Sequence, residues 1–236
     1  MLSFVVPAHN EELELPATLA AIRAAGETTD LPYEIVVVDD ASTDRTREVA
    51  LDAGARIVSV QLRHIAAVRN AGARAAIGDI LFFVDADTHV TAPTIAAALR
   101  AIEAGCVGGS ARLKLDCAVP LWATVFLFLF FALYFAANLG VGAFLFTRRE
   151  HFVAIGGFDE RYFAGEEMYF TLALRKLGRF VILKEPVTTS ARKVRMHSPR
   201  YLFRQWLTML FRGRRALLER KNLDVWYDGK REQSRS

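Results

Sequence analysis

The chain is 236 residues long, 53% hydrophobic and 24% charged, with a formal net charge of +4. This length allows one good-sized core, or one domain with an appendage, and the hydrophobic share exceeds that of typical soluble proteins, so contact with lipid has to be considered. The two cysteines, Cys106 and Cys117, fit neither a disulfide framework nor the spacing of a zinc site.

In chain order, short apolar runs rich in β-branched residues alternate with alanine-rich stretches through the first half. These patterns predict strands at 2–6, 34–38, 56–60 and 80–84, and helices at 15–25, 44–53, 66–76 and 93–104. Thr91 is expected to cap the last of these helices, and Gly54 and Gly105 lie just past predicted C-termini. The alternation predicts a parallel sheet wrapped by helices, which binds ligands beyond the carboxyl ends of its strands.

The second half begins with a stretch from Ala118 to Thr147 that contains no charged residue and is long enough to suggest a membrane span. Asn138, Gly140 and Gly142 interrupt it, so we expect a helix at 120–137 followed by a core strand at 143–146. Further on, the pattern predicts a strand at 180–183 and a basic amphipathic helix from residue 198 onward.

Polar and acidic residues directly follow three predicted strands, in the segments Pro7–Glu12, Asp39–Asp44 and Asp85–Asp87. In the third segment, two carboxylates one residue apart can share a hard cation such as Mg²⁺ or Mn²⁺, whose shell substrate phosphates complete. An ordinary solvated turn would have the same composition, since Asp-x-Asp triplets are common in loops.

The other two segments are less specific. The first lacks the Gly-x-Gly-x-x-Gly pattern of a dinucleotide-binding dehydrogenase, and it is also compatible with a plain turn capped by Asn10. In the second, an aspartate can accept a hydrogen bond from a uracil or guanine N–H. Helix capping alone would account for the serine, threonine and aspartate found there.

The three segments and their order resemble glycosyltransferase family 2, whose members have the GT-A nucleotide-sugar-binding fold. Three further segments extend the resemblance to about residues 2–190: Arg69-Asn70-Ala71-Gly72, Gly156-Gly157-Phe158-Asp159-Glu160 and Gly165-Glu166-Glu167. Each segment is weak by itself, and the ordered set carries the resemblance. A mostly parallel α/β sheet of GT-A type is therefore expected, although a fold does not give a substrate.

The resemblance also implies roles for particular residues. It assigns nucleotide binding to Pro7, Asn10, Glu11, Asp39, Asp40, Arg69 and Asp85, and metal binding to Asp85, Asp87 and, as a further ligand, His197. The general base is expected at the second acid of the family's Glu-Asp pair. That position is Glu167 here, and the departure from aspartate keeps Glu166 as the rival base.

The implied reaction is a single displacement with inversion at the sugar C1, from a nucleoside-diphosphate sugar to an acceptor. The base removes a proton from an acceptor hydroxyl, and a divalent cation, Mg²⁺ or Mn²⁺, neutralises the departing diphosphate. If the acceptor is a lipid phosphate, the attacking oxygen is already ionised, and proton removal by Glu167 is less important.

A single membrane crossing by the uncharged stretch does not fit this reaction, because Asp85 and Asp87 precede it while Glu166 and Glu167 follow it, and one crossing would place them on opposite sides. The helix at 120–137 is therefore either buried in the acceptor half or in contact with lipid, and its nearly uniform apolarity favours lipid.

The composition of the C-terminal tail also favours contact with lipid. Between Arg192 and Lys221 there are ten basic residues and one acid, and aromatic residues lie among them. This composition suits an anionic membrane surface, although a helix docked on the catalytic domain is the alternative. Nucleic acid is not expected as a partner, because no known binding module is present.

We therefore expect a GT-A catalytic domain at 1–190, with a nucleotide-sugar half at 1–110 and an acceptor half at 111–190, followed by a membrane-proximal tail at 191–236. The predicted protein is an inverting, metal-dependent glycosyltransferase that acts on a lipid-linked or cell-envelope acceptor from the cytoplasmic face of the membrane. Two rivals remain: a sugar nucleotidyltransferase, and an inactive family member that serves as a membrane-associated adaptor.

Overall fold

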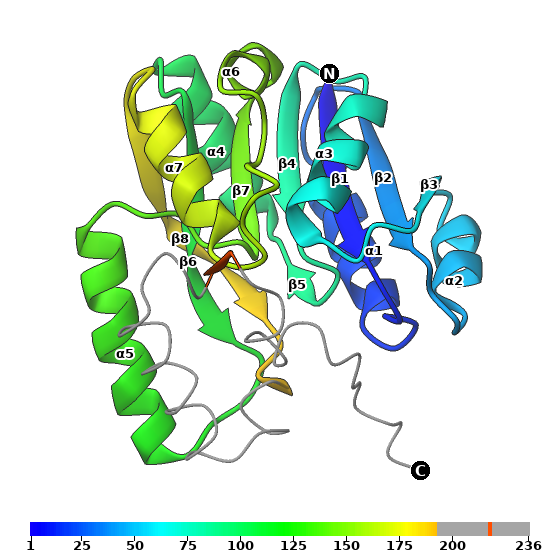
Figure 1. Cartoon of the computed structure of the whole chain (residues 1–236), viewed down its shortest axis with the longest axis horizontal. Coiled ribbons are helices and arrows are strands. Elements are labelled where there is room, and N and C mark those ends of the chain that lie inside the picture. The colour runs from blue at the N-terminus through cyan, green and yellow to red at the C-terminus, as the bar shows by residue number, and fades with distance from the viewer. Residues whose placement is uncertain (193–216, 219–236) are drawn as a thin grey trace.

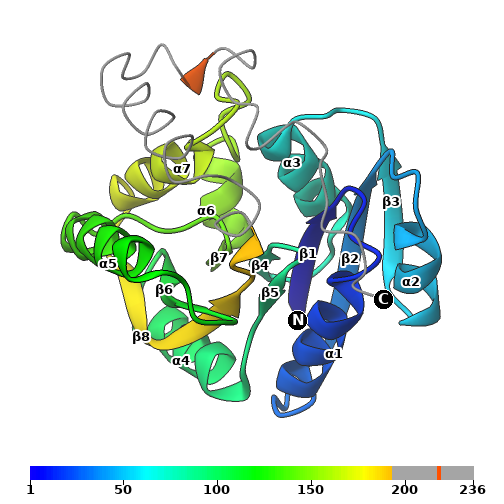
Figure 2. The same cartoon turned by 90° about the horizontal axis from the view of Figure 1, so that it is seen from below.

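The predicted alternation of strands and helices forms one eight-stranded sheet with helices on both faces (Figures 1 and 2). The computed structural model describes residues 1–192 together with 217 and 218. Its strands are β1 (Leu2–Ala8), β2 (Tyr33–Asp40), β3 (Arg56–Val60), β4 (Ile80–Val84), β5 (Thr88–His89), β6 (Gly108–Leu115), β7 (Phe144–Arg148) and β8 (Phe180–Thr189). Its helices are α1 (Leu15–Gly26), α2 (Thr46–Asp52), α3 (Ile65–Ala75), α4 (Ala92–Glu103), α5 (Leu121–Ala136), α6 (Arg149–Ala154) and α7 (Glu166–Arg175).

The strand order is β3-β2-β1-β4-β7-β6-β8-β5. Strands β1, β2, β3 and β4 pair in parallel, as do β6 and β8, whereas β7 runs antiparallel to both of its neighbours and β5 runs antiparallel to β8. Because β6 and β8 have the same direction as β4, the carboxyl ends of β1, β2, β4 and β8 reach the same edge of the sheet. Segments from both halves of the chain therefore leave the sheet at one edge.

The core lies on the two faces of the sheet. One cluster packs α1 and α4 against the sheet, and Phe4 and Phe82 stack in it with ring centroids 4.9 Å apart. The other packs α3, α6 and α7 on the opposite face, where Phe83 contacts Phe152 and Phe158. Strand β1 is buried along its whole length, as expected for the central strand of a sheet covered on both sides.

Helix α3 lies unusually close to the sheet because Gly72 faces it. A methyl group added at Gly72 would be 2.3 Å from Cγ1 of Val5 and 2.7 Å from Cγ2 of Val38, well inside van der Waals contact. Only glycine fits without a shift of the helix. This close approach holds the middle of α3, which carries Arg69 and Asn70, against the sheet, where Arg69 reaches Asp85 at the end of β4.

Helix α5 stands away from the sheet, to which it is joined at both ends (Figure 1). Within α5 only Ala123 is buried, while Leu121, Leu133 and Phe128 are 78%, 75% and 72% exposed. The alternative of a buried helix in the acceptor half is therefore wrong. No helix among the described residues is both long and apolar enough to cross a bilayer.

Candidate functional site

The loops after β1 and β2 are tied together into one rigid platform at the carboxyl edge. The backbone N–H of Asn10 donates to Oγ of Ser42 over 3.0 Å, and the N–H of Glu11 donates to Oγ1 of Thr46 over 2.7 Å. In return, Oδ1 of Asn10 accepts from the N–H of Thr43 over 2.8 Å. Asn10 takes a left-handed φ of 53°, which asparagine tolerates better than most residues.

The two aspartates at the end of β2 are buried and hold neighbouring loops. Oδ1 of Asp39 accepts from the N–H of Ser42 over 3.1 Å, which closes the turn into α2. Oδ1 of Asp40 accepts from the N–H groups of Leu62 and Arg63, at 2.7 and 3.1 Å, and so fixes the loop after β3. Both predicted nucleotide-binding residues thus also shape the edge at which they lie.

The two aspartates after β4 face different partners. Asp85 is 2.7 Å from Nη2 of Arg69, whereas Asp87 is 3.1 Å from Nη2 of Arg192. The sequence predicted that Asp85 and Asp87 share a cation, and in the structure each carboxylate is next to its own guanidinium.

Arg69 joins the two halves of the chain. Its side chain is 2% exposed and pairs with Asp85 at the end of β4 and with Glu166 at the start of α7, while Nη2 also donates to the carbonyl of Gly142 over 3.0 Å. Burial works to lower the pKa of Arg69, but the charges of Asp85 and Glu166 outweigh it and raise that pKa. The guanidinium is turned toward protein carboxylates, not toward the open side of the edge.

Asn70 connects α3 to the loop that precedes α7. Its amide donates to the carbonyl of Phe158 over 2.9 Å and to Oε1 of Glu160 over 2.8 Å, and its Oδ1 accepts from the N–H of Phe158 over 2.9 Å. The glycines of that loop, Gly156 and Gly157, both have a φ of 78°. The Arg-Asn-x-Gly and Gly-Gly-Phe-Asp segments are therefore direct structural partners.

Glu166 and Glu167 lie side by side in the first turn of α7 but in different surroundings. Glu166 is buried against Arg69, whereas Glu167 is partly exposed. Burial, and then the charge of Glu166, raises the pKa of Glu167 to about 8, against a smaller lowering effect of Arg69. The charges of Glu167 and Glu166 also add to burial in raising the pKa of Tyr134, so the C-terminal end of α5 lies near these acids.

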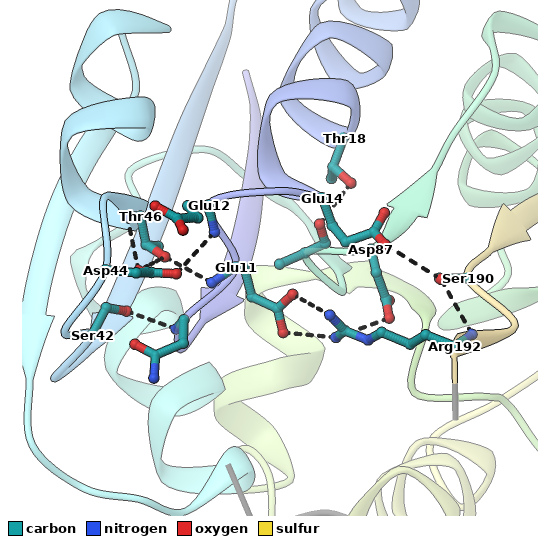
Figure 3. A network of polar contacts seen from close by, with 12 residues as sticks. Glu11, Glu12, Glu14, Thr18, Ser42, Asp44, Thr46, Asp87, Ser190 and Arg192 are labelled. Atoms are coloured by element: carbon teal, nitrogen blue, oxygen red, sulfur yellow. Dashed lines mark hydrogen bonds and ion pairs between the residues drawn. The ribbon is translucent and has the colours of Figure 1, made fainter. Parts of the chain in front are cut away.

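Arg192 was missed as a site residue, because in the sequence it is one of many arginines in the basic tail. Its guanidinium makes a two-pronged contact with Glu11, at 2.6 and 2.7 Å, beside the contact with Asp87 (Figure 3). A usable signal was its position: it follows β8 by three residues at the same edge at which the predicted acids follow β1 and β4.

The residues at the edge fit a divalent cation in their chemistry. Glu11, Glu14 and Asp87 surround Arg192, and Asp85, Glu166 and Glu167 surround Arg69, so acids outnumber arginines in both groups. No three His, Cys, Asp or Glu side chains in the described part of the chain converge as a complete metal cluster. Magnesium is commonly held by one or two carboxylates while substrate phosphates supply other ligands, and Asp85 and Asp87 match that donor set. His197, the further predicted ligand, lies outside the described residues.

A cavity of about 730 Å³ lies beside α7 and the loop before it, lined by residues that include Gly157, Asp159, Tyr169 and Lys176. None of the predicted site residues that the structure describes lines it. The cavity is therefore separate from the acidic edge.

Comparison with known protein sequences gives a match to a family model and to similar proteins. The sequence model described as "Glycosyl transferase family 2" matches residues 3–151. Proteins named "Undecaprenyl-phosphate 4-deoxy-4-formamido-L-arabinose transferase" are similar: that of Aeromonas hydrophila subsp. hydrophila is 36% identical over 99 residues, covering 37% of this chain and 29% of the relative. That of Pectobacterium carotovorum subsp. carotovorum is 38% identical over 99 residues, covering 36% and 28%. The matches thus span less than a third of these relatives.

Solved structures show the same fold. S. aureus TarS in complex with UDP-GlcNAc has a TM-score of 0.62 and 22% identity, covering 81% of this chain and 58% of that one. The mannosyltransferase PcManGT from Pyrobaculum calidifontis, in complex with GDP-Man and Mn²⁺, has a TM-score of 0.62 and 21% identity, covering 79% and 56%. Glucosyl-3-phosphoglycerate synthase from Mycobacterium tuberculosis, in complex with Mn²⁺ and UDP, has a TM-score of 0.62 and 19% identity, covering 89% and 78%. The predicted GT-A fold class is confirmed, whereas the basic amphipathic helix predicted from residue 198 onward lies outside the described residues.

Proposed function

Because the chain belongs to glycosyl transferase family 2, we propose that it transfers a sugar from a nucleoside-diphosphate sugar to a lipid-linked acceptor at a membrane surface. One observation carries the proposal: acids from three segments far apart in the sequence meet at one edge of the sheet. Arg69 joins Asp85 to Glu166, and Arg192 joins Glu11 to Asp87. A solvated turn after β4 would not need such partners.

The donor is proposed to lie along the platform formed by the loops after β1 and β2. Asn10, Glu11 and Asp39 belong to that platform, and Asp85 and Asp87 lie at the end of the strand next to β1. The structural neighbours in complex with UDP, UDP-GlcNAc or GDP-Man support a nucleotide-sugar donor.

Glu167 is the proposed general base, and Glu166 is proposed to position Arg69. The carboxylate of Glu166 is buried and engaged by the guanidinium of Arg69, which keeps it from an acceptor and disfavours it as the base. Glu167 has a raised pKa and therefore binds a proton more readily near neutral pH, as a general base requires. A glutamate in place of the family's commoner aspartate moves the carboxylate by about one bond length without changing this chemistry.

In the proposed reaction an acceptor oxygen attacks the sugar C1 from the face opposite the diphosphate, the C1–O bond to the diphosphate breaks, and the configuration inverts. With a hydroxyl acceptor, Glu167 takes the proton; with a phosphate acceptor, the attacking oxygen is already ionised. A divalent cation would be held by Asp87 with Asp85 beside it, and would neutralise negative charge on the departing diphosphate.

A lipid phosphate is the proposed acceptor, and α5 is the proposed contact with the membrane. Its exposed apolar side chains suit the lipid interface, and its C-terminal end lies near Glu167. Arg175, which donates to the carbonyl of Ala137 over 2.8 Å, and Asn138, which donates to the carbonyl of Phe180 over 3.0 Å, anchor that end. The undecaprenyl phosphate in the relatives' names supports the same acceptor class. The chain would then act at the cytoplasmic face of the membrane.

Activity is tested by measuring nucleoside diphosphate release from a panel of UDP- and GDP-sugars, with and without Mn²⁺, in the presence of a polyprenyl phosphate. We expect metal-dependent release with one donor, lost in Asp87→Asn and reduced about 10²–10⁴-fold in Glu167→Gln. Glu150→Gln, at an exposed acid, is the matched control. Pyrophosphate release from a nucleoside triphosphate and a sugar phosphate would favour the nucleotidyltransferase, and a folded protein without any turnover would favour the adaptor.

Membrane contact is tested separately by co-sedimentation with phosphatidylcholine vesicles, with and without phosphatidylglycerol. The double variant Phe128→Ser/Leu133→Ser removes two exposed apolar side chains of α5, and we expect its binding to fall by at least about tenfold. Leu51→Ser, at an equally apolar and 52% exposed position on α2, should bind as the wild type does. Equal binding of all three proteins would exclude α5 as the contact.

A further inference from the structure

Arg192, near the C-terminal end of the described residues, lies between two acids of the N-terminal half, Glu11 and Asp87. Its side chain is 11% exposed, and those of Glu11 and Asp87 are 6% and 13% exposed, so the three groups interact largely out of water (Figure 3). Charge pairs in such surroundings are stronger than pairs on an open surface. Arg192 is therefore a built-in counter-ion of the acidic edge.

The two contacts of Arg192 differ in kind. Glu11 accepts from both Nη1 and Nη2, over 2.6 and 2.7 Å, in the forked geometry that fixes a guanidinium most firmly. Asp87 takes one contact, over 3.1 Å, from the Nη2 that Glu11 already shares. Arg192 can consequently leave Asp87 while Glu11 keeps it at the edge.

Both acids have further polar support that stays in place if this happens. The N–H of Glu11 is bound to Thr46, and the backbone carbonyl of Asp87 accepts from the N–H of Ser190 over 3.2 Å. The N–H of Arg192 itself donates to Oγ of Ser190 over 3.3 Å. The contact between Arg192 and Asp87 can therefore be lost by a rotation of the Arg192 side chain while these backbone hydrogen bonds remain.

A divalent cation at Asp87 and a guanidinium at Asp87 exclude each other, because like charges repel strongly at contact distance. A donor diphosphate placed next to that cation brings new anionic oxygens within reach of the same edge. The guanidinium fork is well suited to them, since arginine binds phosphate oxygens as it binds carboxylates.

We propose that Arg192 is an exchangeable cation that occupies Asp87 in the empty protein and moves to the donor diphosphate when a divalent cation takes Asp87. This rests on the proposed function, because it assumes a nucleoside diphosphate as the ligand. The cation and the nucleotide then bind cooperatively. Either ligand alone has to displace Arg192 or bind beside it, whereas the two together provide the diphosphate to which Arg192 moves.

The test is a pair of binding measurements on the full chain, with Mn²⁺ alone followed by electron paramagnetic resonance, and with UDP or GDP followed by calorimetry at saturating Mn²⁺. In Arg192→Gln we expect Mn²⁺ alone to bind about tenfold more tightly, because its competitor is gone, and the nucleotide to bind about tenfold more weakly. The two changes have opposite signs, which a merely structural role of Arg192 would not produce.

Two further variants separate the proposed exchange from a general effect of net charge. Arg192→Lys keeps a positive charge at the position, and its affinity for Mn²⁺ alone should stay near the wild-type value. Arg63→Gln removes the same charge from the same edge, where Arg63 contacts His9, and should leave the binding of Mn²⁺ alone unchanged. Tightening of Mn²⁺ binding by Arg63→Gln as well would reduce the effect to net charge and overturn the proposed exchange.

The exchange is also overturned if Arg192→Gln, with a wild-type melting temperature, binds Mn²⁺ alone no more tightly or binds the nucleotide equally well. If the wild type binds neither UDP nor GDP in the presence of Mn²⁺, the proposed function falls together with the exchange. Nucleotide binding that is equal in wild type and variant removes the exchange alone.

Discussion

Arg69 and Arg192 both neutralise acids at the carboxyl edge of the sheet, and they differ in depth and in the number of their partners. Arg69 is 2% exposed and has two carboxylates and a carbonyl around it, in the interior between α3, β4 and α7. Arg192 is 11% exposed, is held firmly by one acid and touches a second through one contact. The first arrangement is suited to fixing two halves of a fold, and the second to changing partners.

The largest expected effect comes from removing the buried arginine. Arg69→Gln leaves Glu166 as a buried carboxylate without its counter-charge, and we expect a loss of about 3–5 kcal/mol of unfolding free energy in urea denaturation. Arg161→Gln, at a 71% exposed arginine paired with Asp159, is the control and should cost less than about 1 kcal/mol. Equal losses would show that Arg69 is not the link between the halves.

The position of Arg69 depends on the close packing of α3 on the sheet. A methyl group added at Gly72 tests this packing. Gly72→Ala places a Cβ 2.3 Å from Val5, and overpacking of this kind should cost about 1–3 kcal/mol of unfolding free energy. Adding Val5→Ala to the variant should recover part of that cost, because it removes the atom that the new methyl group meets. A double variant that is less stable than the sum of the single ones would contradict this explanation.

Replacing Arg192 should lower the stability less than replacing Arg69 does, and the loss should depend on the metal. Arg192→Gln is expected to cost about 1–2 kcal/mol without metal, because Asp87 and Glu11 lose their counter-charge closer to water. Added Mn²⁺ should restore that stability, since a cation at Asp87 replaces the lost charge, whereas it should restore nothing in Arg69→Gln. Thermal unfolding of both variants with and without Mn²⁺ measures the contrast.

The smallest expected effect concerns Glu167 and has a defined pH dependence. Its pKa in the folded protein is raised from 4.5 to about 8, so between these values the folded state holds a proton that the unfolded state has released. Stability therefore falls as pH rises through this window. Glu167→Gln has no such proton to lose and should melt about 2–4 °C higher than the wild type at pH 9, with little difference at pH 4. A parallel pH profile of the two proteins would contradict the raised pKa.

Much of the fold could be predicted from local patterns. The strands at 56–60 and 80–84 have the predicted bounds, and Thr91 caps α4 as expected, accepting from the N–H of Thr94 over 3.3 Å. Strand β6 was missed, because its paired glycines and alternating charges look like a loop, and β8 extends six residues further than predicted, past Pro186. Both strands depend on pairing with each other, which no local pattern reveals.

The sequence by itself determined which residues carry charge at the strand ends, the alternation that builds the sheet, and the apolar character of α5. Side-chain period and propensity act over a few residues, so they can be read in any short window. Only the tertiary structure decided which acid each arginine neutralises, since Arg69 reaches Glu166 across 97 positions and Arg192 reaches Glu11 across 181. It also decided that α5 is exposed, because exposure depends on whether the rest of the chain folds over a helix, and apolarity alone does not tell that.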